Sequence, residues 1–176
     1  MGQVQRALLR HKEGVNGALL IKGVHGSGKT TLSQYIVDCF FKKANTFWLN
    51  APINGSAQPE DFLTVLRKAV GSEDDLFGIL NDMPPESVIV INDLELWWER
   101  SNTGYGALKS IMDLVNIYGG EILFIINCNI HAYSIINKVF PIEDNFISVI
   151  ECAPFNTKQL QYMVMSRHKS SGIAFR

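Results

Sequence analysis

One stretch of this chain restricts its fold more than any other: residues 23–30 match the pattern GxxxxGK[ST]. The apolar run at 18–21 comes directly before it and suits a strand that is buried on both faces. After it, apolar residues recur at helical spacing between Leu32 and Phe40, as on one face of an amphipathic helix. Strand, glycine-rich loop and helix are the context that this pattern requires, so it predicts an α/β fold with a phosphate-binding loop.

The chemistry of such a loop follows from its residue types. Glycines allow the backbone to turn successive N–H groups inward onto an anion, and the positive end of the following helix dipole points to the same place. Lys29 is then placed for the β- and γ-phosphates, and the Thr30 hydroxyl for the Mg²⁺ that accompanies them. We therefore expect a nucleoside triphosphate as the ligand. The predicted binding residues are Gly23, Val24, His25, Gly26, Ser27, Gly28, Lys29, Thr30 and Thr31.

Composition narrows the class of protein further. The 176 residues are enough for one domain, and 47% hydrophobic with 19% charged residues is ordinary for a globular α/β protein. The formal charge of −1 offers no basic field for nucleic acid, and no apolar run is long enough to span a membrane. The three cysteines lie in apolar segments without metal-ligand spacing, so we expect buried, reduced thiols and a cytoplasmic location. They are Cys39, Cys128 and Cys152.

Strand and helix patterns alternate along the rest of the chain. Residues 1–16 are typical of a short polar helix or strap. Further strands are predicted at 46–50, 88–91, 122–126 and 146–150, and further helices at 59–70, 73–81, 107–118, 132–139 and from 156 or 157 to about 168. Such alternation implies parallel βαβ units with right-handed crossovers, so we expect a three-layer α/β/α sandwich around five parallel strands.

Polar residues follow two of the buried strands, where ligands of open α/β sheets collect. Asp93 follows the strand at 88–91 and is the candidate for holding Mg²⁺, with a helix cap or loop carboxylate as the alternative. Glu95 either polarises the attacking water or faces solvent. After the next strand, Asn129 is our first candidate for orienting the water and Asn127 the second, although turn asparagines often bond their own backbone.

With these pieces, residues 17–165 resemble the AAA+ ATPases and the broader class of P-loop NTPases with an additional strand. The resemblance implies the strand order 5-1-4-3-2, ATP and Mg²⁺ as ligands, and an asparagine sensor after the fourth strand. It also implies that ATP binding and Mg-dependent hydrolysis drive conformational change in attached domains or partners. Residues 122–175 are more closely similar to a group of poorly characterised bacterial AAA-family ATP-binding proteins.

The chain departs from that family at the end of its third strand. The family has two adjacent acids there, and Asn92 takes the first place if Ile91 is the last apolar position. In that register Asn92 stands at the metal position and Asp93 at the base position, so hydrolysis is slow or absent. In the alternative register Asp93 holds the metal and Glu95 acts as the base.

A second departure concerns assembly. The family places an arginine after the sensor asparagine to reach a neighbouring subunit, but residues 130–155 contain no arginine. Arg100 and Arg167 are the alternatives, and we interpret Arg167 as a surface residue of the last helix. A homo-oligomer in which one subunit activates the next is therefore not supported by this sequence.

The expected domain organisation is a P-loop core at 1–155 and the start of a truncated helical lid at 156–176, within a longer protein or as a natural remnant. Two other functions stay open. A nucleotide-binding regulatory switch with little hydrolysis fits Asn92, whereas a small-molecule kinase would lack the additional strand and show a lid arginine cluster. Trp97 and Trp98 are expected to pack within the domain.

Overall fold

The structure is a computed structural model that describes residues 2–41 and 45–171. The strands in this part of the chain form one parallel sheet. Its strands are β1 (Ala18–Gly23), β2 (Thr46–Asn50), β3 (Val88–Asn92), β4 (Leu123–Asn129) and β5 (Phe146–Cys152). Their order across the sheet is β2-β3-β4-β1-β5, and each neighbouring pair is parallel. From the other edge this is the predicted order 5-1-4-3-2. The predicted α/β fold is therefore confirmed, including the strand that separates β1 from β3.

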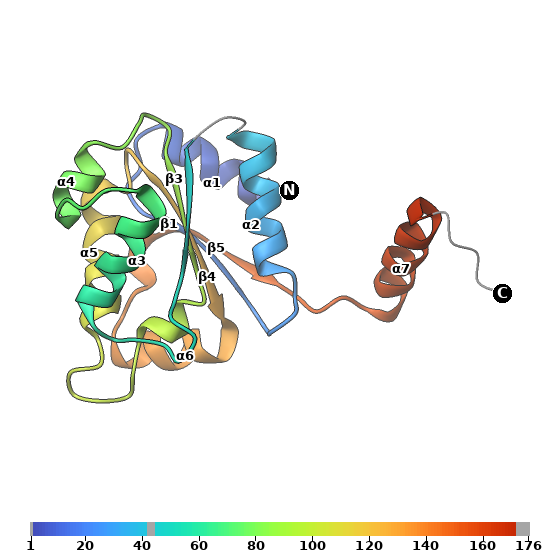
Figure 1. The fold of residues 1–176 in the computed structure, drawn as a ribbon. Coiled ribbons are helices and arrows are strands. Elements are labelled where there is room, and N and C mark those ends of the chain that lie inside the picture. Colours follow the sequence, from blue (N-terminus) through green and yellow to red (C-terminus); the bar gives the residue numbers. More distant parts are fainter. Residues whose placement is uncertain (1, 42–44, 172–176) are drawn as a thin grey trace.

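Helices cover both faces of the sheet (Figure 1). They are α1 (Gly2–Lys12), α2 (Lys29–Phe40), α3 (Pro59–Val70), α4 (Leu76–Asn81), α5 (Gly106–Tyr118), α6 (Ile130–Val139) and α7 (Thr157–Ser171), with 3-10 turns η1 (Leu94–Trp97) and η2 (Glu143–Asn145). Side chains of α1 and α2 share one hydrophobic cluster with one face of the sheet. Side chains of α3 to α6 and η1 share a second cluster with the opposite face. These two clusters are the cores of the predicted three-layer sandwich.

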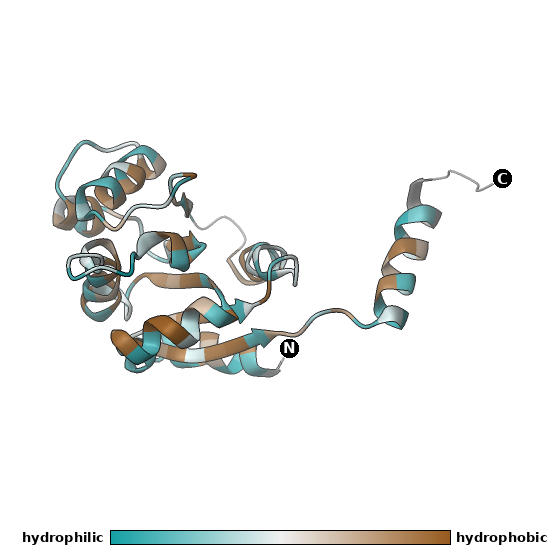
Figure 2. Cartoon of the chain, turned by 90° about the horizontal axis from the view of Figure 1, so that it is seen from below, coloured by the Kyte–Doolittle hydropathy of each residue, from teal (hydrophilic) through white to brown (hydrophobic). Residues whose placement is uncertain are grey.

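Alternation along the strands decides which layer each residue meets. In β3, Val88 and Val90 belong to the cluster under α2, whereas Ile89 and Ile91 belong to the cluster under α5. The strands of Figure 2 are accordingly brown between their two helical layers. Because successive side chains point to opposite faces, Asn92 continues on the face of α2.

Several predicted boundaries differ from the structure. Strands β4 and β5 run on to Asn129 and Cys152, so both reach further toward the loop edge than their apolar runs indicated. Helix α4 begins at Leu76 and not at 73, because the Asp75 side chain accepts a hydrogen bond from the Gly78 N–H at 2.8 Å and caps the helix there.

The chain after β3 forms η1 and buries one tryptophan. Trp97 is 0% exposed and meets the Phe62 ring edge-on at 5.4 Å, whereas Trp98 is half-buried against Tyr105. The prediction that both pack within the domain is therefore confirmed. Helix α1 is amphipathic and not merely polar, since Val4 and Leu8 are buried in the core.

Helix α7 lies apart from the sandwich after an extended segment, and most of its side chains are exposed (Figures 1 and 2). The division at residue 155 stays a prediction, and residues 172–176 of the expected lid fragment lie outside the described residues. Of the three unbonded cysteines, Cys128 is buried and Cys152 half-buried. The prediction was wrong for Cys39, which is exposed because it lies on the outer side of α2. No helix in the described ranges has the length and apolarity needed to cross a bilayer.

Candidate phosphate-binding site

The loop between β1 and α2 depends on glycine at defined points. Gly26 and Gly28 adopt φ angles of 75° and 91°, in the left-handed region that side chains disfavour. At Gly23 an added Cβ would lie 2.5 Å from the Ser27 hydroxyl and 2.7 Å from the Cys152 carbonyl oxygen. The loop therefore closes tightly over the end of β1, and a side chain at Gly23 would open it.

Lys29 lies inside this loop. It is 8% exposed, and its ammonium group donates to the carbonyl oxygens of Gly23 and Val24 at 3.2 Å each. It is also the first residue of α2, whose N-cap Gly28 provides no side-chain cap and whose first turn contains no acid. The N–H groups at this helix end and the Lys29 cation thus lie at the same place, where together they would stabilise an anion.

The Ser27 hydroxyl gives an independent sign of a ligand. It is buried and has no hydrogen-bond partner in the structure. Buried polar atoms are normally paired, and leaving one unpaired costs about 1–3 kcal/mol. A phosphate oxygen in the loop would accept a hydrogen bond from this hydroxyl, so the residues present fit the predicted triphosphate. Thr30 and Thr31 lie exposed in the first turn of α2.

Three neighbouring strands carry an asparagine at or near their carboxyl ends on the face of α2, and we call Asn50, Asn92 and Asn127 the asparagine row. Asn92 lies opposite Asn50 in the β2–β3 register and donates to its Oδ1 at 2.9 Å. Asn127 donates to Asn92 Oδ1 at 2.7 Å, and its own Oδ1 lies 3.0 Å from the Ser33 hydroxyl of α2. The helix that follows the loop is thereby joined to three neighbouring strands.

The predicted acids, Asp93 and Glu95, lie at the same edge of the sheet but on the side that faces away from α2. Asp93 adopts a left-handed conformation (φ 51°), is exposed and opens η1, whose Leu94 and Trp97 pack in the cluster under α5. Glu95 is half-buried, and its Oε2 accepts a hydrogen bond from the Asn129 backbone N–H at 2.9 Å. The structure thus brings Glu95 to the end of β4, while Asp93 lies at the surface.

The side chain of Asn129 is engaged as a helix cap. Its Oδ1 accepts from the backbone N–H groups of His131 and Ala132 at 2.9 and 3.4 Å, at the start of α6. This is the local use of asparagine that sequence reasoning had kept as the alternative. A role for Asn129 in orienting water stays a prediction, as do the roles of Asp93 and Glu95.

Cys128 connects these groups electrostatically. Burial raises the pKa of its thiol, and the negative charge of Glu95 raises it further, while the positive charge of Lys29 acts in the opposite direction. The thiol therefore lies within electrostatic reach of both the Glu95 carboxylate and the Lys29 ammonium group.

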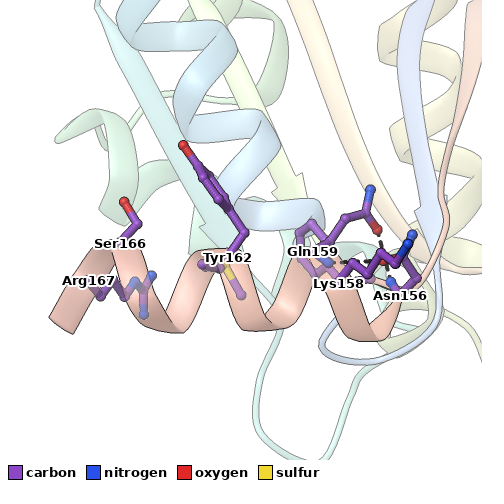
Figure 3. Close-up of a pocket in the computed structure, with 8 residues that line it drawn as sticks. Asn156, Lys158, Gln159, Tyr162, Ser166 and Arg167 are labelled. Carbon is purple, nitrogen blue, oxygen red and sulfur yellow. Dashed lines mark hydrogen bonds between the residues drawn. The ribbon is translucent and has the colours of Figure 1, made fainter. Parts of the chain in front are cut away.

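A cavity of about 540 Å³ opens beside the loop. Loop residues and the first turns of α2 form one side, with Leu32 and Tyr35 among its lining. Phe155, Met163 and Arg167 form the other side, so Arg167 lines this space although we interpreted it only as a surface residue. The same three residues border a second hollow of about 670 Å³ along α7, in which Tyr162 and Arg167 are labelled in Figure 3.

Metal donors fit this site only in part. Within the described ranges no three His, Cys, Asp or Glu side chains gather into a metal site. Nucleotide-bound Mg²⁺ needs only one or two protein oxygens beside the phosphates, and the Thr30 hydroxyl suits that use. At the end of β3, however, Asn92 is an amide whose oxygen and nitrogen both have partners. The residues therefore fit the metal on the loop side and not at the strand end that faces α2.

Sequence reasoning missed Ser33 and Asn50 as parts of this edge. A usable signal was present, because the runs at 46–50, 88–92 and 123–127 each end in asparagine at a position that continues one face of the strand.

Comparisons with known proteins identify the type of fold. No protein-family model matches the chain, and no curated protein matches it in sequence. Among solved structures, the ORC2 protein of Aeropyrum pernix, solved in ADPNP–ADP complexes, matches with a TM-score of 0.68 at 13% identity. That match covers 96% of this chain and 50% of the other.

Two further solved structures match the fold of this chain. The Walker-type ATPase of Pyrococcus abyssi has a TM-score of 0.65 at 12% identity, covering 98% of this chain and 59% of that one. The RuvB Holliday junction branch migration motor of Thermotoga maritima has a TM-score of 0.65 at 14% identity, covering 99% and 51%. The chain therefore has the fold of an AAA+ P-loop ATPase core and spans about half the length of these proteins. At such identities the likeness concerns the fold alone.

Proposed function

We propose that this chain is the ATP-binding core of a P-loop ATPase of the AAA+ type, in which ATP binding and hydrolysis change the conformation of attached domains or partners. The observation that carries the proposal is the loop itself. Its left-handed glycines, the buried Lys29 ammonium group and the unpaired Ser27 hydroxyl converge on the uncapped start of α2. A polyphosphate would accept hydrogen bonds from all of these groups at once, which supports the proposal.

In this proposal the chain's own groups bind and orient the nucleotide. Backbone N–H groups from Val24 to Thr31 hold the phosphates, and Lys29 exchanges its two carbonyl partners for phosphate oxygens. Thr30 would hold Mg²⁺, which supplies positive charge to the β- and γ-phosphates when it is bound. The base of the nucleotide would occupy the neighbouring cavity beside Tyr35 and Phe155.

A second candidate function is a nucleotide-dependent switch that scarcely hydrolyses its ligand. Two observations favour it: the strand-end residue facing α2 is Asn92, and the side chain of Asn129 is engaged as a cap. The side-chain oxygens of both residues thus already accept hydrogen bonds within the protein.

A single-turnover assay separates the two functions. Protein in excess over radiolabelled ATP and Mg²⁺ is sampled for bound ATP and for released phosphate, with Lys29→Ala as the non-binding control. Binding followed by release supports the ATPase, and binding without release supports the switch. No binding by the unaltered protein would refute both.

The register of the acids is tested in the same assay. If Asp93 holds the metal and Glu95 acts as base, Asp93→Ala weakens the Mg²⁺ dependence of binding more than Glu95→Ala does, while Glu95→Ala slows phosphate release. Equal Mg²⁺ dependence in the two variants would reject that register.

A further inference from the structure

The asparagine row forms a hydrogen-bond chain whose amides are oriented in one direction. The Ser33 Oγ on α2 lies 3.0 Å from Asn127 Oδ1 and 3.2 Å from the Lys29 carbonyl oxygen, and its single proton serves one of these acceptors at a time. Asn127 Nδ2 donates to Asn92 Oδ1, and Asn92 Nδ2 donates to Asn50 Oδ1. Ser33, Asn127 and Asn92 are buried, and only Asn50 at the far end is exposed. This series of hydrogen bonds runs from α2, the helix that follows the phosphate loop, to the outermost strand β2.

This direction requires amides at its two buried strand positions. Asn127 and Asn92 each accept one hydrogen bond and donate another, and an ionised carboxylate can only accept. With the amides oriented in this way, a carboxylate at Asn92 would set its oxygen against Asn50 Oδ1. The row is therefore built from neutral groups, and its residue types follow from the bonds it makes.

The row occupies the side of the sheet edge that faces the loop helix. Asn127 is bonded to Ser33, which lies one helical turn after Lys29, the first residue of α2. Two nearby carboxylates lie at the start of η1 on the opposite layer, where Glu95 is bonded to the Asn129 N–H and Asp93, the residue before η1, is exposed. Mg²⁺ prefers anionic oxygen ligands, and Asn92 offers an amide oxygen that is already bonded.

We propose that Asn92 sets the metal dependence of this site, so that the neutral row lets a nucleoside triphosphate bind with little dependence on Mg²⁺. The inference rests on the proposed function, since it concerns the nucleotide held by the same loop. Backbone N–H groups, the helix end and Lys29 provide the positive charge that the phosphates need. No buried carboxylate in the row repels the phosphates, so no cation is needed to offset one.

The test measures the affinity of a non-hydrolysable ATP analogue by calorimetry, once with Mg²⁺ and once with EDTA. For the unaltered protein we expect the two dissociation constants to agree within about fivefold. Asn92→Asp introduces a buried negative charge, and the exposed Asn50 can rotate its amide to donate to it. In this variant we expect the affinity in EDTA to fall and the ratio of the two constants to rise at least about tenfold.

Asn50→Asp is the matched control, because it makes the same change of charge at the exposed end of the row. Its ratio should stay within about twofold of the unaltered protein, since solvent screens its charge. A ratio above about tenfold in the unaltered protein overturns the inference even if Asn92→Asp fails to fold. An unchanged ratio in folded Asn92→Asp also overturns it. Absence of binding in both conditions overturns the proposed function, and the inference with it.

Discussion

The phosphate loop and the asparagine row lie at the same edge of the sheet but are built on different principles. The loop owes its shape to backbone angles at glycines and carries a cation, Lys29, against its own carbonyl groups. The row owes its shape to side-chain amides and carries no charge. The cation of the loop and the neutral amides of the row are therefore held by separate sets of contacts. One half of the site can be complete while the other is neutral.

The largest effect should come from Lys29→Ala, which removes the cation of the loop. Charge-assisted hydrogen bonds contribute about 1.5–3 kcal/mol each, so triphosphate affinity should fall at least about 100-fold by calorimetry. Lys22→Ala is the control, because Lys22 pairs with Glu151 on the opposite face of the sheet. It should leave the affinity within about twofold. Unchanged affinity in Lys29→Ala would contradict the proposal that the loop binds the triphosphate through this cation.

Gly23→Ala should act on the loop through its backbone. Its new methyl group would meet Ser27 Oγ at 2.5 Å and the Cys152 carbonyl at 2.7 Å, and the carbonyl oxygen cannot rotate away. We expect the loop to open and triphosphate affinity to fall about tenfold. Gly14→Ala provides a contrast, since nothing lies within 4 Å of its added Cβ, although its φ of 80° adds local strain. Equal affinity for Gly23→Ala and the unaltered protein would contradict the close packing described for the loop.

Asn127→Leu should act on stability and spare binding, which would separate the row from the loop. The substitution leaves Asn92 Oδ1 without its donor in a buried place, while the Ser33 hydroxyl keeps the Lys29 carbonyl oxygen as an acceptor. The free energy of unfolding in urea should fall by about 1–3 kcal/mol, and by less for Asn50→Leu at the exposed end. Triphosphate affinity should change less than about threefold. If Asn127→Leu lost more binding free energy than unfolding free energy, the row would have to contribute directly to triphosphate binding.

The smallest effect concerns Cys128, whose side chain belongs to the cluster on the sheet face opposite the asparagine row. Because burial raises the pKa of its thiol, the folded protein keeps the proton at a pH where the unfolded chain releases it. The stabilising contribution is complete below the usual thiol pKa of 9.0 and falls as the pH rises above it. Between pH 8 and pH 10 the unaltered protein should therefore lose about 1 kcal/mol more unfolding free energy than Cys128→Ala. Parallel pH profiles for the two proteins would argue against an ionisable thiol buried at this position.

How far the fold could be predicted depended on whether a signal was local. Continuous apolar runs such as 88–91 and 122–126 identified buried parallel strands, and the family resemblance supplied their order. Boundaries shifted where a single contact decided them, as at the Asp75 cap of α4. The exposure of Cys39 could not be predicted from its apolar neighbours, because it depends on which side of α2 meets the sheet.

The candidate site divides in the same way. The loop could be predicted from the sequence alone, since its glycines, Lys29 and Thr30 lie within eight residues and their geometry follows from local backbone angles. The bonds from Asn92 to Asn50 and Asn127, which lie 42 and 35 positions away, became visible in the folded structure alone. The reason is that a side-chain hydrogen bond between strands depends on strand order, register and face together, and no short sequence pattern encodes all three.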